Sequence, residues 1–123
     1  MITVILIFIA GILNACMDVL RYRWTTSIFR FWKNQHWINP ALSWSNKWKL
    51  DTKIGDFIMS TFLVFLTDFW HFCKFLMLLA VFCSIVFYIP LINWWADILI
   101  LYCTFTITFE VFFSKILIRK KNI

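Results

Sequence analysis

Hydrophobic residues form three long blocks along the chain. The first extends from Ile2 to about Leu20, close to the ~20 residues that an α-helix needs to cross a bilayer. A second apolar run extends from Phe57 to Tyr88, and a third from about Ala96 to Leu117. The pattern predicts an all-α integral membrane protein with three transmembrane helices and a short interfacial or re-entrant helix.

The second apolar run is too long for one span. It contains about 32 residues, whereas a straight span needs only ~17–25. We therefore expect an interfacial helix over residues 56–66, followed by a span over about 68–88. Thr67 is the predicted N-cap, and Asp68 in the first turn suits the helix macrodipole. The complete prediction is a single transmembrane domain over residues 1–123, with spans at about 2–20, 68–88 and 96–117.

The first block is predicted to be a retained span rather than a cleaved signal peptide, because no basic residue precedes its apolar run. Its far end is polar. Asn14, Asp18 and Arg21 have the spacing i, i+4, i+7, which places them on one helical face. The alternative is an ordinary helix end, with Asp18 already in headgroup water.

The connection over residues 21–55 has a different character, because Trp alternates there with Arg and Lys. Trp prefers the membrane–water interface, and basic side chains beside it meet lipid phosphates. We expect membrane lipids as partners here, through Arg23, Trp24, Trp44 and Trp48. Aromatic and basic residues also suit nucleotide stacking, but we expect no nucleic acid partner.

The basic residues also predict an orientation. The formal net charge is +6, and eleven of the 12 Lys and Arg residues lie in the 21–55 connection or near the C-terminus, including Lys120 and Lys121. Under the positive-inside rule, these two regions are cytoplasmic, and the N-terminus and the connection near Pro90 lie outside. The expected location is a bacterial cytoplasmic (inner) membrane.

The composition supports a helical membrane protein. Hydrophobic residues make up 63% of the chain, against ~45–50% in soluble domains. Two Gly and two Pro leave little room for a loop-rich β fold. Four cysteines lie within the apolar blocks without a C-x-x-C spacing, so we expect buried free thiols rather than a disulfide or zinc site.

The predicted topology brings several ionisable and polar residues to the cytoplasmic end of the spans. Charged residues inside a membrane are rare and by default indicate function, a partner or a pathway. On one helix, Asp68 and His71 are neighbours at i, i+3. The predicted intramembrane polar site consists of Asn14, Asp18, Arg21, Asp68, His71, Lys74 and Glu110.

Four hypotheses for this site remain open. The charges could pair for stability, Asp68 with His71 or Arg21, and Lys74 with Glu110. Asp68 and His71 could instead bind a divalent metal ion as cofactor, because mixed carboxylate and imidazole ligands suit borderline metals. The site could recognise an anionic lipid headgroup through Arg21 and the Trp-rich connection. Finally, the charges could line a homo-oligomeric ion channel or pore.

No motif in the sequence decides whether the protein is an enzyme. It contains no phosphate-binding loop, nucleophile elbow or dinucleotide fingerprint. A structural or accessory subunit of a membrane complex is a further alternative. Because three helices enclose a polar site poorly, we expect a homo-oligomer or a larger partner.

Two stretches of the sequence carry a resemblance. Trp37 to Trp48 reads Trp-Ile-Asn-Pro-Ala-Leu-Ser-Trp-Ser-Asn-Lys-Trp, and Leu66 to His71 reads Leu-Thr-Asp-Phe-Trp-His. They resemble small uncharacterised bacterial inner-membrane proteins, in which an aromatic-Asn-Pro and Ser-Trp-x-Asn-Lys loop precedes Thr-Asp-x-Trp-His. The resemblance implies a bacterial cytoplasmic membrane and assigns no catalytic residue.

The predicted topology can be tested by cysteine labelling. A thiol engineered near Asn93 should react with an impermeant reagent from outside, and one near Asn46 only from inside, because the basic connection stays cytoplasmic. The reverse pattern, or reaction of both thiols from one side, would contradict the three-span topology.

Overall fold

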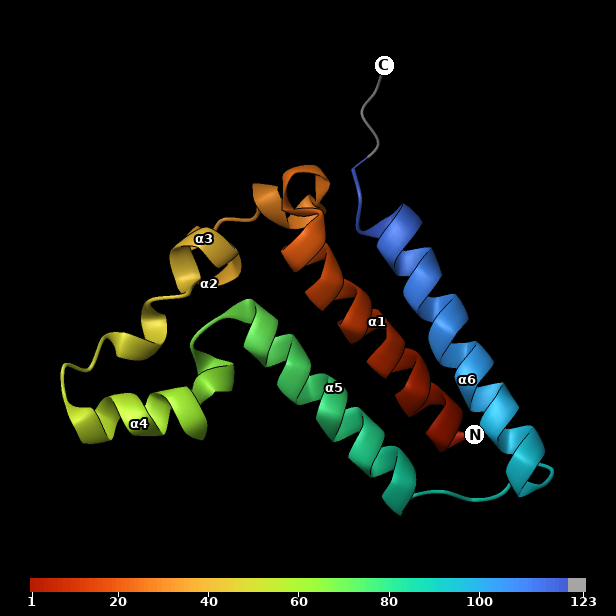
Figure 1. The fold of residues 1–123 in the computed structure, drawn as a ribbon. Helices are drawn as coiled ribbons and strands as arrows, with labels where there is room; N and C mark the ends of the chain where they lie inside the picture. The colour runs from red at the N-terminus through yellow and green to blue at the C-terminus, as the bar shows by residue number, and fades with distance from the viewer. Residues whose placement is uncertain (120–123) are drawn as a thin grey trace.

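Three long helices dominate the computed structural model, which describes residues 1–119 (Figure 1). The predicted basic anchor at Lys120 and Lys121 lies outside the described residues. The long helices are α1 (Ile2–Tyr22), α5 (Phe69–Val86) and α6 (Trp94–Val111), which continues as a π-helical turn, η5 (Phe112–Ile116). The predicted all-α class is confirmed, and each of the three helices is long and apolar enough to cross a membrane.

Short helices connect α1 to α5. None of those before α4 exceeds four residues, in keeping with the Trp-rich and basic composition of the connection. In chain order they are η1 (Trp24–Thr26), η2 (Ile28–Phe31), α2 (Gln35–Ile38), α3 (Pro40–Ser43), η3 (Asn46–Trp48), α4 (Lys53–Thr61) and η4 (Val64–Leu66).

Helix α1 is the centre of the molecule and lies between α5 and α6 (Figure 1). Its approach to α6 is close, because a Cβ atom at Gly11 would lie 3.0 Å from the carbonyl oxygen of Phe105. On the other side, Cys16 of α1 and Cys73 of α5 are buried in the same core cluster. The expectation of buried free thiols is wrong for Cys103, which is exposed on α6.

Backbone pairing joins the ends of α1 and α6. Ser27, just after η1, forms an isolated antiparallel bridge with Ile118, just after η5. The Ile28 amide donates to the Leu117 carbonyl at 3.0 Å. These contacts fix α1 and α6 in parallel, with the start of α5 near the same end of the molecule (Figure 1).

A buried carboxylate organises the opposite end. Asp97, in the first turn of α6, is only 1% exposed and accepts three hydrogen bonds from the connection that precedes the helix. The donors are the Tyr88 hydroxyl at 2.7 Å, the Leu91 amide at 2.9 Å and the Ile92 amide at 3.1 Å. The bond to Asp97 also raises the pKa of the Tyr88 phenol above its usual value. Asp97 therefore closes this turn.

The break in the long apolar run is confirmed, but its boundaries differ from the prediction. The expected interfacial helix over 56–66 is replaced by α4 over Lys53–Thr61 and the separate turn η4. Helix α4 begins earlier because Thr52 caps it, its hydroxyl accepting from the Gly55 amide at 3.0 Å.

The caps of α5 and α6 also correct the predicted spans. Asp68, not Thr67, is the N-cap of α5, and its carboxylate accepts from the His71 amide. Asn93 caps α6 by accepting from the Ala96 amide at 3.0 Å, so this helix starts two residues before the predicted limit. In both cases the helix starts where a side chain can accept a hydrogen bond from a free backbone amide of the first turn.

Candidate functional site

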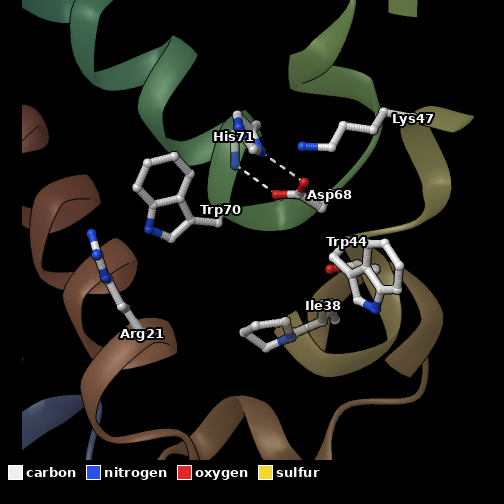
Figure 2. A pocket seen from close by; sticks show the side chains of 9 residues that line it. Arg21, Ile38, Trp44, Lys47, Asp68, Trp70 and His71 are labelled. Atoms are coloured by element: carbon white, nitrogen blue, oxygen red, sulfur yellow. Dashed lines mark hydrogen bonds and ion pairs between the residues drawn. The ribbon is translucent and has the colours of Figure 1, made fainter. Parts of the chain in front are cut away.

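A pocket of about 310 Å³ lies where α1 ends and α5 begins (Figure 2). Its walls come from three parts of the chain: the last turn of α1, the α2–α3–η3 connection and the first turn of α5. The lining residues are Arg21, Ile38, Pro40, Ser43, Trp44, Lys47, Asp68, Trp70 and His71. Apart from Arg21, all of them belong to the two stretches on which the resemblance rests.

Local hydrogen bonds shape the loop side of the pocket. Asn39 accepts from the Ala41 amide at 3.0 Å and caps α3, whose first residue is Pro40. Pro suits this position, because its fixed φ is helical and its missing amide proton would have no partner there. The Asn-Pro pair thus starts the short helix that brings Ser43 to the pocket.

Two side chains attach this loop to the start of α5. The Asn46 amide group donates to the His36 carbonyl at 2.9 Å and to the Thr67 carbonyl at 2.8 Å. The Trp37 indole donates to the Leu66 carbonyl at 3.2 Å. These bonds join the loop to Leu66 and Thr67, just before Asp68. They therefore hold the loop wall of the pocket next to the wall formed by the first turn of α5.

Asp68 positions His71 through both of its carboxylate oxygens. Oδ1 accepts from the His71 amide at 2.8 Å, and Oδ2 lies 2.7 Å from the His71 imidazole Nδ1. The Thr67 hydroxyl donates to Oδ2 at 3.3 Å. An ionised carboxylate only accepts hydrogen bonds, so the proton of this contact lies on Nδ1. Nε2 is then the ring nitrogen left for a ligand.

Two cations line the same pocket. Figure 2 shows Lys47 extended toward the Asp68–His71 pair, while Arg21 lies along α1 on the other side of Trp70. Within residues 1–119, neither forms an ion pair, and the Asp68 carboxylate is paired with His71 instead. Arg21 lies 5.3 Å from the Tyr22 ring, and Lys47 lies 5.8 Å from the Trp48 ring. Both charges therefore remain available to an anion.

Only part of the predicted polar site meets in this pocket. Arg21, Asp68 and His71 do, but Asn14, Asp18, Lys74 and Glu110 do not line it. Of the two partners considered for Asp68, the structure shows His71, and within residues 1–119 Asp68 forms no ion pair with Arg21.

The pairing of Lys74 with Glu110, one of the alternatives considered, is not found in residues 1–119. Lys74 lies over the Trp70 ring at 5.4 Å, and Glu110 accepts a hydrogen bond from Ser114 in its own helix. The two residues belong to α5 and α6, and α1 lies between these helices.

The interface residues predicted from the sequence separate into two groups. Trp44 lines the pocket, whereas Arg23, Trp24 and Trp48 do not. Arg23 instead stacks over the Phe113 ring at 4.4 Å, which adds a contact between the ends of α1 and α6. Trp44 and Trp48 are both strongly exposed and available to a membrane surface.

Sequence reasoning missed Lys47, Ser43 and Trp70 as site residues. Each of them lies within one of the two stretches that carry the resemblance. Membership in these stretches was the sequence signal that could have identified them as site residues. For the metal hypothesis, the described part of the chain contains no group of three His, Cys, Asp or Glu side chains that could hold an ion. A metal at Asp68 and His71 would find only two protein ligands there.

The chain matches no protein-family model, no curated protein and no solved structure. The resemblance of its two stretches to bacterial inner-membrane proteins therefore stays a prediction.

The attachment of the loop can be tested with Asn46→Ala. Loss of both donated bonds should destabilise the protein by about 1 kcal/mol per bond, because two carbonyls lose their partner. Hydrogen exchange around Thr67–His71 should also become faster. Asn34→Ala is the matched control, since the Asn34 side chain is exposed and makes no capping bond. Equal effects of the two substitutions would show that Asn46 does not hold the pocket together.

Proposed function

We propose that this chain is an integral membrane protein, with α1, α5 and α6 as its spans. Three long apolar helices support this proposal. The outer faces of α5 and α6 are also strongly apolar, with Phe82 60% exposed and Ile107 63% exposed. Water would not favour such surfaces, whereas hydrocarbon accepts them. The basic connection and the pocket then lie at the cytoplasmic interface of a bacterial inner membrane.

We further propose that the pocket binds an anionic headgroup that carries phosphate or carboxylate. The observation that carries this proposal is that Arg21 and Lys47 line the pocket without an ion pair in residues 1–119, while the Asp68 carboxylate is bonded to His71. A guanidinium contacts phosphate or carboxylate through two parallel hydrogen bonds, and an ammonium adds a compact positive charge. The site therefore presents net positive charge to a ligand.

The shape of the pocket fits a headgroup at the membrane surface. Its volume of about 310 Å³ is in the lower range of small-molecule sites. Trp44 and Trp70 supply apolar walls beside the cations. Trp is favoured at the level of the lipid headgroups, where one part of the ring is apolar and the other wet. A lipid could thus place its headgroup in the pocket and its chains along the helices.

Binding can be tested with short-chain phosphatidic acid added to the purified protein in mild detergent. The wild type should gain thermal stability with increasing lipid, because a ligand that binds only the folded state stabilises it. Arg21→Gln and Lys47→Gln should each weaken the apparent affinity by about tenfold or more, since each removes a charged hydrogen bond. Lys49→Gln is the matched control, because Lys49 is exposed, close in sequence and outside the pocket.

Three further ligands separate the alternatives. Short-chain phosphatidylcholine should stabilise the protein less than phosphatidic acid, because its headgroup is zwitterionic. Inorganic phosphate alone tests whether the lipid chains contribute to binding. Zn²⁺ tests the metal hypothesis. Stabilisation of the wild type by Zn²⁺, without stabilisation of His71→Gln, would support that hypothesis. No stabilisation by any anion would contradict the proposed site.

Proton transfer is a second candidate function of the same pocket. It is favoured by the 2.7 Å contact between Asp68 Oδ2 and His71 Nδ1. A carboxylate that holds one ring nitrogen fixes the tautomer and directs the other nitrogen toward a reacting group. His71 could then accept a proton from a water molecule that attacks the phosphorus atom of a bound headgroup, while Arg21 and Lys47 stabilise the developing negative charge. The bond from phosphorus to the glycerol oxygen breaks, that oxygen takes a proton from solvent and leaves as the alcohol, and His71 returns its proton to solvent.

This second function predicts turnover as well as binding. Wild-type protein incubated with phosphatidic acid should release inorganic phosphate, and His71→Gln should lower the rate by about 10²-fold or more, as expected for a lost general base. Its affinity for phosphatidic acid should change much less, because both cations remain. If the wild type binds the lipid without releasing phosphate, the site is a binding site only.

A further inference from the structure

Within residues 1–119, α6 leaves its outer face without a protein neighbour, and α5 leaves only the later part of its outer face, around Phe82 and Val86. The first part of α5 contacts η4, where the Phe65 and Phe75 rings stack with 4.4 Å between their centroids. Helix α1 packs along both α5 and α6, whereas these two lie on opposite sides of it (Figure 1). The chain is therefore close to a single layer of three helices, with α5 at one edge and α6 at the other. Each edge carries an exposed charged residue.

Lys74 is the exposed charged residue of α5, on the flank of the helix about 100° from the buried Cys73. It is exposed, and within residues 1–119 its ammonium group contacts no carboxylate, lying instead 5.4 Å from the Trp70 ring. It is five residues from Phe69, the first residue of α5, which at 1.5 Å per residue corresponds to roughly 8 Å along the helix.

Glu110 is the charged residue at the α6 edge. It is exposed, and its bonding partner in the described chain is Ser114, one turn further along. It lies six residues before Ile116, at the end where α5 begins, which corresponds to roughly 9 Å along the helix. Lys74 and Glu110 thus carry opposite charges at similar depth on opposite edges.

The outer face of α6 carries further polar groups. Tyr102, Thr106 and Glu110 follow one another at intervals of four residues and are all exposed, Tyr102 by 66%. A carboxylate at this depth is unfavourable toward lipid, most at the centre of a span and less toward its ends. A helical partner with a cation at the matching depth would remove this penalty.

We propose that α6 of one copy packs against α5 of a second copy, with Glu110 paired to Lys74 of its neighbour. Within one chain the two residues cannot meet, because α1 separates their helices. Between copies, the two edges are complementary in charge and depth. The contact is head-to-tail, since it joins different surfaces of the two copies, and its repetition builds a ring where the rotation between copies closes and an open array where it does not. The inference rests on the membrane insertion proposed above and does not depend on the anion pocket.

Charge reversal tests this interface in mild detergent, with particle mass measured by light scattering. The wild type should be a multimer. Glu110→Lys and Lys74→Glu should each shift it toward the monomer, because two like charges then face each other. The double variant should restore the multimer. A monomeric wild type, or a double variant no more associated than the single variants, would overturn the proposal.

A cysteine crosslink in membranes tests the orientation of the contact. Cys103 is an exposed native thiol on α6, 13 residues before Ile116, and Phe82 is exposed on α5, 13 residues after Phe69. Both therefore lie roughly 20 Å from the same end. Phe82→Cys should form an intermolecular disulfide with Cys103 on mild oxidation, whereas Leu78→Cys, exposed on α5 at a shallower depth, should not.

The native thiol provides one further discriminating outcome. If α6 packed against α6 of a two-fold related copy, wild-type protein would crosslink through Cys103 alone. That result would overturn the head-to-tail arrangement and favour a symmetric dimer. Cysteine labelling near Asn46 and Asn93 tests insertion separately, so a failure of the interface can be distinguished from a failure of the membrane proposal.

Discussion

The carboxylate of Asp68 is the contact on which the site depends, because it serves the backbone and the imidazole at the same time. Oδ1 caps α5 and so determines where the long apolar run divides into α4, η4 and a separate helix. Oδ2 holds the His71 ring. A carboxylate at a helix N-terminus is stabilised by the free amides and by the macrodipole. The aspartate therefore tolerates its burial. Its carboxylate is hydrogen-bonded to His71, and neither Arg21 nor Lys47 forms an ion pair within residues 1–119.

The position of the pocket follows from the arrangement of the three long helices. Because α1 and α6 are parallel and α5 runs in the opposite direction, the last turn of α1 meets the first turn of α5. Arg21 and Asp68 are thereby brought to one pocket, although they are far apart in the sequence. The close contact at Gly11 and the bridge between Ser27 and Ile118 stabilise this order by holding α6 against the other side of α1.

Much of the fold was predictable from the sequence, because its signals are local. Long apolar blocks, a run too long for one span, and the i, i+3 spacing of Asp68 and His71 are properties of short segments. The pairing of Lys74 with Glu110 failed because it required knowledge of which helix lies in the middle. Lys47 was missed for a related reason, since only the bonds of Asn46 to two distant carbonyls bring its loop to α5. Helix order and loop attachment are long-range properties that no periodicity encodes.

Two buried aspartates at opposite ends of the molecule show how a structural carboxylate differs from one that can also serve a ligand site. Asp97 bonds to two backbone amides and one phenol within the adjacent connection, and its hydrogen-bonding capacity is used within the protein. Asp68 bonds to one amide and to an imidazole whose ring is 27% exposed as a side chain and lines a pocket. The Asp97 arrangement closes the turn between α5 and α6, and Asp97 does not line the pocket. In the second arrangement, the buried Asp68 carboxylate orients the His71 ring, so that its other nitrogen faces a ligand in the pocket. Arg21 and Lys47 line the same pocket and favour an anion. This difference, rather than burial or charge alone, is why the end of the bundle at Asp68 is the candidate site and the end at Asp97 is not.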